Sequence, residues 1–99
     1  MSDVLADFEA TAQSLRQAGL SFLSELGPYI LAASGHGVAS DTRGCARALG
    51  VAHALVIREC NSLADELGLL ALKDRGDKSQ RLFFEPTARG ARLLEEAMA

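Results

Sequence analysis

The chain has 99 residues, the length of a single domain, and its composition of 48% hydrophobic and 23% charged residues excludes an intrinsically disordered chain. The apolar runs are only a few residues long and the N-terminus is acidic, so the sequence predicts neither a membrane span nor a secretory signal. The net charge of −3 argues against a strongly basic nucleic-acid binder, although residues 41–81 carry seven Arg or Lys against six Asp or Glu.

The first predicted element is a long helix within residues 1–26. Apolar or small residues recur there at alternating intervals of three and four, which is typical of a helix that packs along one seam. The seam consists of Leu5, Phe8, Ala12, Leu15, Gly19, Phe22 and Leu26. It could fold back on its own domain or pair with a second chain, and in so short a protein we favour a homodimer interface. Gly19 allows a break or a close crossing within the seam.

Two short helices are predicted next. Pro28 suits the first turn of a helix that ends near Gly35. A loop follows, and Ser40 or Asp41 then offers an N-cap for a helix over residues 41–49. Gly50 and Val51 predict a turn, so this helix and the one after it have the spacing of a helix-turn-helix.

A longer helix is predicted over residues 52–67, with Gly68 as its C-terminal cap. Its buried face is defined by Val56, Cys60, Leu63 and Leu67. At about 100° per residue, the residues that point away from this face are Ala54, Arg58, Asn61 and Asp65. The residues on its flanks are His53, Ile57 and Glu59. Asp65 and Glu59 would repel phosphates that came close.

Residues 70–85 predict a β-hairpin, in which the segments "LLALKDR" and "RLFFEP" flank the polar turn "GDKSQ". Pro86 and Thr87 then begin a last helix that runs close to the end of the chain. The predicted fold class is mostly α with a small β-hairpin (α+β). The chain would form one domain, residues 1–99, in which a winged helix-turn-helix over residues 28–98 follows the N-terminal dimerisation helix.

The chain resembles the MarR-type winged helix-turn-helix transcriptional regulators. The resemblance covers roughly residues 28–97 and rests on the segments "CARALGV", "LADELGLL", "KDRGDKSQRLFF" and "PTARGARLLEEA". It implies a homodimer in which each helix 52–67 enters a major groove of double-stranded DNA and each hairpin touches an adjacent minor groove. We therefore expect a DNA-binding transcriptional regulator that acts as a dimeric repressor.

The candidate DNA contacts follow from this geometry. Arg58 could bind a phosphate or a guanine, Asn61 could pair with adenine, and Ile57 could touch a thymine methyl group. The other candidates are His53 and Ala54 near the start of the same helix, Arg43 and Arg47 on the supporting helix, and Lys73, Arg75, Lys78 and Arg81 in the wing. Each of these charged residues could equally lie on an ordinary solvated surface with no role in binding.

A rival interpretation is a winged-helix protein-interaction module, such as an anti-activator or an adaptor, that does not bind DNA. It explains the acidic net charge and the apolar side chains of Leu55 and Ile57 on the helix that would face DNA. We carry it as the alternative to DNA binding, with a protein as the partner.

The two cysteines, Cys45 and Cys60, are expected to be buried and reduced in a cytoplasmic protein. Together with His36 and His53 they lack the paired spacing of metal ligands, so neither a metal nor another cofactor is expected. No catalytic motif is present, and the sequence does not predict an enzyme.

Overall fold

The arrangement of helices and strands comes from a computed structural model that describes residues 4–76, 78 and 80–98, with only the backbone of Val4 and Leu5. The elements are α1 (Val4–Arg16), α2 (Leu26–Gly35), α3 (Thr42–Leu49), α4 (His53–Asp65), β1 (Leu70–Asp74), β2 (Leu82–Pro86) and α5 (Ala88–Met98). The described residues thus form a compact α+β fold of five helices and a two-stranded antiparallel hairpin, consistent with a small winged helix. No helix among them is long and apolar enough to cross a membrane.

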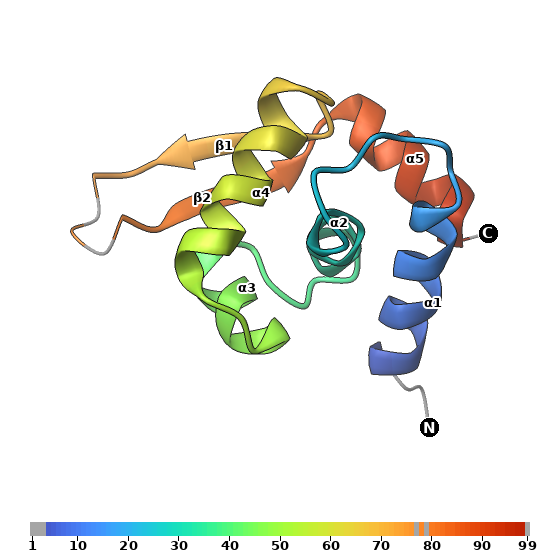
Figure 1. The fold of residues 1–99 in the computed structure, drawn as a ribbon, viewed down its shortest axis with the longest axis horizontal. Helices are drawn as coiled ribbons and strands as arrows, with labels where there is room; N and C mark the ends of the chain where they lie inside the picture. The colour runs from blue at the N-terminus through green and yellow to red at the C-terminus, as the bar shows by residue number, and fades with distance from the viewer. Residues whose placement is uncertain (1–3, 77, 79, 99) are drawn as a thin grey trace.

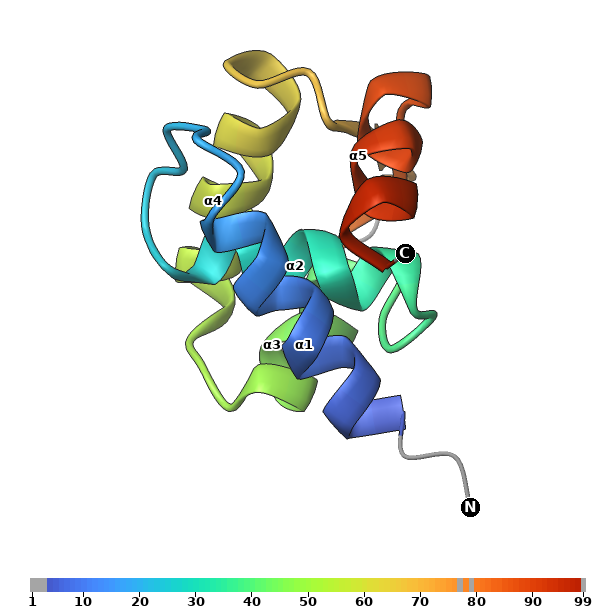
Figure 2. The ribbon, with the colours of Figure 1, turned by 90° about the vertical axis from the view of Figure 1, so that its right-hand side faces the viewer.

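Helix α2 lies at the centre of the fold. In Figure 1 it is seen end-on, with α1 and α5 on one side and α3, α4 and the hairpin on the other. Figure 2 shows α1 lying across it. Four consecutive residues, Ile30 to Ala33, are completely buried, because a helix that is apolar all round must be covered on every side. Contacts of α2 with α1, α4, α5 and β2 supply that cover.

The N-terminal helix is shorter than the heptad pattern predicts. It ends at Arg16, and residues 17–25 form an irregular connection that includes Gly19 in the left-handed region, at φ +79°. The prediction of one helix that reaches Leu26 is therefore wrong. The prediction failed because the apolar residues after Arg16 keep the heptad spacing although they no longer belong to α1. Phe22 lies in the connection and Leu26 begins α2, and both face the core.

The predicted seam belongs largely to the domain's own core. Phe8, Ala12 and Leu15 are buried within the single chain, where α1 packs against α2 and α5. These three side chains therefore form no open dimer surface, which corrects that part of the expectation. Phe22 and Leu26 are partly buried against the same core, whereas Gly19 is exposed. The side chain of Leu5 lies outside the described residues.

The helix-turn-helix is built as its capping residues predict. The Asp41 side chain accepts a hydrogen bond from the Gly44 N–H at 2.7 Å, which caps the start of α3. Gly50, with φ +68°, ends that helix in the left-handed conformation. Helix α4 then runs from His53 to Asp65, one residue shorter at its start and two at its end than predicted.

The hairpin is joined to the helix-turn-helix through its second strand. In the antiparallel register Leu72 pairs with Phe84 and Lys73 with Phe83. The Phe84 N–H donates to the Ser40 carbonyl oxygen at 3.0 Å, so the segment before α3 lies along the outer edge of β2. The wing is thereby attached to α3 by main-chain bonding and is not a free projection.

Helix α5 is fixed by its first turn. The Thr87 hydroxyl donates to the Gly68 carbonyl oxygen at 2.7 Å and accepts the Gly90 N–H at 3.0 Å. The Thr87 N–H donates to the Leu69 carbonyl oxygen at 3.0 Å, which holds this carbonyl against the start of α5. A Cβ atom added at Gly90 would clash with the same oxygen.

We therefore expect Gly90→Ala to destabilise the fold by about 1–3 kcal/mol, because main chain on both sides must move to relieve the clash. Gly44→Ala is the matched control, since Gly44 occupies the same position relative to its own N-cap and its added Cβ would meet Asp41 at an ordinary 3.5 Å. It should be neutral or stabilise by about 0.5–1 kcal/mol. Urea unfolding followed by circular dichroism measures both, and equal effects would contradict the close approach.

Candidate nucleic-acid interface

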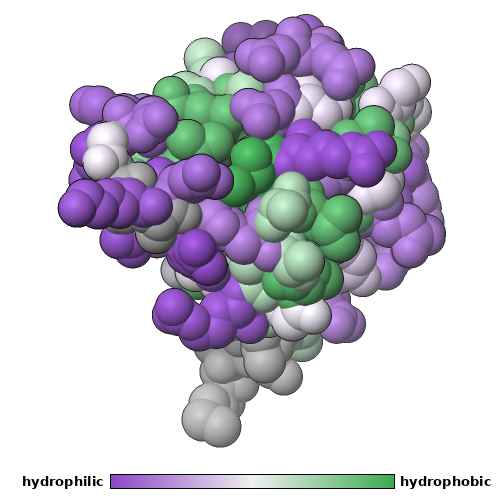
Figure 3. Space-filling view, turned by 60° about the vertical axis from the view of Figure 1, so that its left-hand side comes forward, coloured by the Kyte–Doolittle hydropathy of each residue, from purple (hydrophilic) through white to green (hydrophobic). Residues whose placement is uncertain are grey.

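The outward face of α4 carries the side chains that the helical periodicity of the sequence predicted to lie there. Val56, Cys60 and Leu63 are buried on the inner side, which leaves Arg58 and Asn61 exposed on the other. Ala54 is also exposed, and His53 and Ile57 are half-buried. Figure 3, which turns the hairpin side toward the viewer, shows hydrophilic side chains around smaller hydrophobic areas on this face. The face therefore mixes hydrophilic and hydrophobic side chains.

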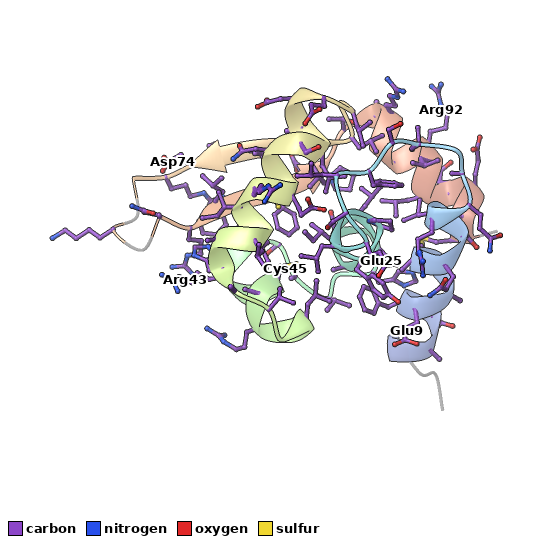
Figure 4. All side chains as sticks on the ribbon, viewed as in Figure 1. Glu9, Glu25, Arg43, Cys45, Asp74 and Arg92 are labelled. Carbon is purple, nitrogen blue, oxygen red and sulfur yellow. The ribbon has the colours of Figure 1, made fainter. Side chains whose placement is uncertain are left out.

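Helix α3 adds two cations beside α4. Arg43 and Arg47 are both exposed, and their spacing of four places them on one face of the helix. Figure 4 shows Arg43 projecting away from the core, below the hairpin. The structure thus brings together the predicted residues of the supporting helix and those of the wing on one side of the molecule.

The wing arginines are organised by Phe83. The guanidinium carbon of Arg75 lies 4.1 Å from the centre of the Phe83 ring, and that of Arg81 lies 5.4 Å from it. Such cation–π contacts hold both side chains on the outward face of the hairpin. Sequence reasoning missed Phe83, although the alternation of a strand offered a signal. Since Phe84 is buried, its neighbour must point outward.

Beside this cluster the wing is hollowed. A shallow hollow of about 520 Å³ lies between β1, β2 and the start of α3, and Lys73, Arg75, Phe83, Glu85 and Ser40 contribute to its lining. Lys73 and Lys78 are exposed. Asp77, which the sequence places in the wing turn, lies outside the described residues.

Thr42 connects the three elements of the face. It is completely buried, and its hydroxyl oxygen accepts the Leu82 N–H at 3.0 Å. The same oxygen lies 2.7 Å from Nε2 of His53. A single side chain at the start of α3 thus bonds the first residue of α4 and the first residue of β2. No sequence signal marks it, since its partners lie 11 and 40 residues away.

His53 occupies the point where these elements meet. Burial and the positive charge of Arg43 lower its pKa from 6.5, and the carboxylate of Asp41 acts in the opposite direction. His53 is therefore neutral in the free protein at neutral pH.

Glu59 is placed differently from the sequence expectation. It is only 3% exposed, and the Ser24 hydroxyl donates to its Oε1 at 2.7 Å. The carboxylate therefore faces the connection between α1 and α2 and lies away from the outward face, where a phosphate on that face would not come close to it. The helical periodicity of the sequence predicted that Glu59 lies on a flank of α4. It could not predict that the connection between α1 and α2 packs over this flank. Asp65 is exposed, as predicted.

Both cysteines are completely buried, as predicted. Burial and then the Asp41 carboxylate raise the pKa of Cys45 to about 11. Burial, followed by Cys45 and Glu59, raises the pKa of Cys60 to about 12. Among the described residues no group of three His, Cys, Asp or Glu side chains is placed to hold a metal ion.

Comparison with known proteins adds no identity: no family model, curated protein or solved structure matches the chain. The class of protein that the fold defines is a compact α+β domain with a winged-helix-like arrangement. Its candidate interface is the face shared by α3, α4 and the hairpin.

The Thr42 connection predicts a specific loss of stability. Thr42→Val keeps the shape of the side chain but leaves the Leu82 N–H and His53 without their partner, so the free energy of unfolding should fall by about 1–3 kcal/mol. Amide exchange should also quicken at Leu82. Thr11→Val is the control, because buried Thr11 bonds only the side chain of half-exposed His36 among the contacts described, at 2.7 Å. An equal loss in both variants, with Leu82 exchange unchanged, would refute the connecting role.

The burial of Cys45 and Cys60 predicts that a thiol reagent labels the folded protein slowly. Both are buried and both have a raised pKa, so the reactive thiolate is scarce at neutral pH and reaches solvent only through unfolding. A thiol reagent should label the native protein on the order of a hundredfold or more slower than the urea-unfolded chain. Fast stoichiometric labelling of the native state would contradict this assignment.

Proposed function

We propose that this protein is a DNA-binding transcriptional regulator with a winged helix-turn-helix, in which α4 lies in the major groove of duplex DNA and the hairpin reaches the adjacent minor groove. The observation that carries the proposal is that α3, α4 and the hairpin pack side by side and that each carries exposed basic residues (Figure 1). The burial of Glu59 away from that face removes a carboxylate that would oppose it.

The roles of the α4 residues follow from their exposure. Arg58 projects from the middle of the helix and is suited to guanine or to a phosphate. Asn61, one turn further on, is suited to adenine, and half-buried Ile57 offers an apolar contact for a thymine methyl group. Ala54 and His53 lie at the end of α4 that enters the groove, where a small side chain permits close approach.

The wing supplies contacts that depend little on sequence. Arg75 and Arg81 are held against Phe83, so less side-chain entropy is lost when they meet a negatively charged groove. Lys73 and Lys78 extend the same positive charge along the hairpin. Arg43 and Arg47 of α3, both exposed, would bind the DNA backbone beside α4.

A homodimeric repressor is part of the same proposal, since two copies would read two half-sites one helical turn apart. Because Phe8, Ala12 and Leu15 are used inside the domain, a second copy must meet other surfaces. Exposed apolar side chains outside α3, α4 and the hairpin include Leu23, at 44% exposure, and Met98, at 47%.

The alternative function is a protein-interaction module that does not bind DNA. One observation favours it: Leu55, on the candidate recognition helix, is 45% exposed. An apolar side chain of this size on α4 suits a protein partner better than a phosphate backbone. The net charge of −3 agrees with the same alternative.

Binding of the parent to duplexes selected from a random pool tests the proposal. Arg58→Ala should weaken binding to the selected site by about 1–3 kcal/mol and relax its sequence preference, because a base contact is lost. The double variant Arg75→Ala/Arg81→Ala should weaken binding to all duplexes alike and flatten the dependence of log affinity on log salt by about one unit per lost phosphate contact.

Arg92→Ala is the matched control, since Arg92 is an exposed arginine on α5, far from Arg43 and the hairpin in Figure 4. It should leave both affinity and sequence preference unchanged. If the parent selects no sequence and binds no duplex even at about 50 mM salt, DNA binding is wrong and the protein-interaction module takes its place. Sedimentation of the bound complex gives the number of copies per site.

A further inference from the structure

An apolar hollow lies between α1, α2 and the end of α3. Its volume is about 440 Å³, and the described residues that line it are Phe8, Glu9, Leu26, Tyr29, Ala48 and Leu49. None of the six belongs to α4 or to the hairpin. In Figure 1, α1 lies on the opposite side of α2 from the hairpin. The hollow is therefore a second candidate binding surface, distinct from the recognition helix and the wing.

The walls of the hollow are formed by packed side chains. The rings of Phe8 and Tyr29 meet edge to face, with their centres 5.8 Å apart and an angle of 65° between their planes. Leu26, Tyr29 and Leu49 are half-buried, so each keeps part of its apolar surface open to solvent. Ala48 is exposed on the α3 side, and its short side chain leaves that edge open. The hollow can therefore receive apolar side chains of a partner.

The charge beside the hollow is negative on the α1 side. Glu9 is exposed and takes part in no ion pair among the described residues. Asp7, also exposed, precedes it on α1, and the cation of this helix, Arg16, is already paired with Glu25 at 3.0 Å. Figure 4 shows Glu9 on the opposite side of α2 from Arg43. A partner that places positive charge beside α1 would complement this surface.

The spread of these charges favours a protein segment over a small molecule. Asp7 is not among the residues that line the hollow, so the negative charge extends along α1 beyond it. On the α3 side, exposed Arg47 precedes Ala48 in sequence and disfavours further cations there. An amphipathic helix meets both conditions, because its apolar side chains share one face and its cations can flank that face on one side.

We propose that the hollow between α1, α2 and α3 is a docking site for a basic amphipathic helix of a partner protein. Leucine-sized side chains of the partner lie against Leu26, Tyr29 and Leu49, and a lysine or arginine of the partner pairs with Glu9. This site requires no contact with DNA, and it lies apart from Leu55, the exposed apolar side chain of α4.

A synthetic peptide tests the docking site. The probe has about 15 residues, enough to form a helix when bound, with leucines at positions i, i+3, i+4 and i+7 and lysines beside this stripe. Fluorescence anisotropy of the labelled peptide measures its affinity for the full chain. A second peptide with glutamate in place of every lysine should bind at least about tenfold more weakly. In NMR spectra the amides of Tyr29, Ala48 and Leu49 should shift when the lysine peptide binds.

Ala48→Glu separates docking in the hollow from a general attraction between opposite charges. The longer side chain obstructs the open edge of the hollow, yet it adds negative charge to the protein. Docking predicts that the lysine peptide binds about tenfold more weakly or worse, whereas attraction between charges alone predicts tighter binding. Because Ala48 is exposed on α3, the variant should keep its fold, which circular dichroism checks.

Glu9→Gln should weaken binding of the lysine peptide about two- to fivefold, the effect of losing one ion pair near the surface. Glu85→Gln is the matched control, since it removes the same charge from an exposed position on β2. It should leave the affinity unchanged. Equal effects of the two variants would mean that the peptide senses only the net charge, and the docking site would be wrong.

Two other results would also overturn the docking site. One is the absence of binding by the lysine peptide at about 1 mM, or tighter binding to Ala48→Glu. The other is sedimentation of the free protein as a dimer that Ala48→Glu converts to a monomer, which would assign the hollow to a second copy of the chain. None of these measurements involves duplex DNA, so the docking site and DNA binding can fail separately.

Discussion

The buried hydroxyl group of Thr42 is the contact on which the candidate interface depends. Its oxygen meets the first residue of α4 and the first residue of β2, and the neighbouring Asp41 caps α3. An unpaired N–H in this position would cost more free energy than the hydrogen bond contributes, so the relative placement of α4 and the hairpin is tightly specified. A mutation here would act on three elements at once.

Around that contact, the fold is organised by the need to cover α2. A helix with four successive fully buried residues has no solvated side, so one chain of 99 residues must supply cover in every direction. Helix α4 and strand β2 cover one side, and α1 with α5 covers the other. This requirement takes Phe8, Ala12 and Leu15 into the core and removes them from any surface that a second copy could meet.

The net charge of −3 is a poor guide to the candidate interface, because the structure places charges unevenly. Three carboxylates of residues 41–81 accept hydrogen bonds from other groups of the chain. Asp41 bonds the Gly44 N–H, Asp74 bonds the Gly76 N–H, and Glu59 is bonded by Ser24. The arginines and lysines of the same segment are mostly exposed. The net charge alone therefore does not describe how charges are distributed over α3, α4 and the wing.

The sequence by itself determined the elements whose signals are local. The N-cap Asp41, the left-handed Gly50 and the Val56–Cys60–Leu63 stripe predicted the helix-turn-helix, and strand alternation predicted the hairpin. Tertiary structure alone decided that α1 ends at Arg16 and folds back, because a heptad pattern marks an apolar side but not what covers it. It also decided the burial of Glu59 and the bonds of Thr42. The partner of Glu59 lies 35 residues away in the chain and that of Thr42 lies 40 residues away. The periodicity of a single helix or strand carries no information on such distant partners.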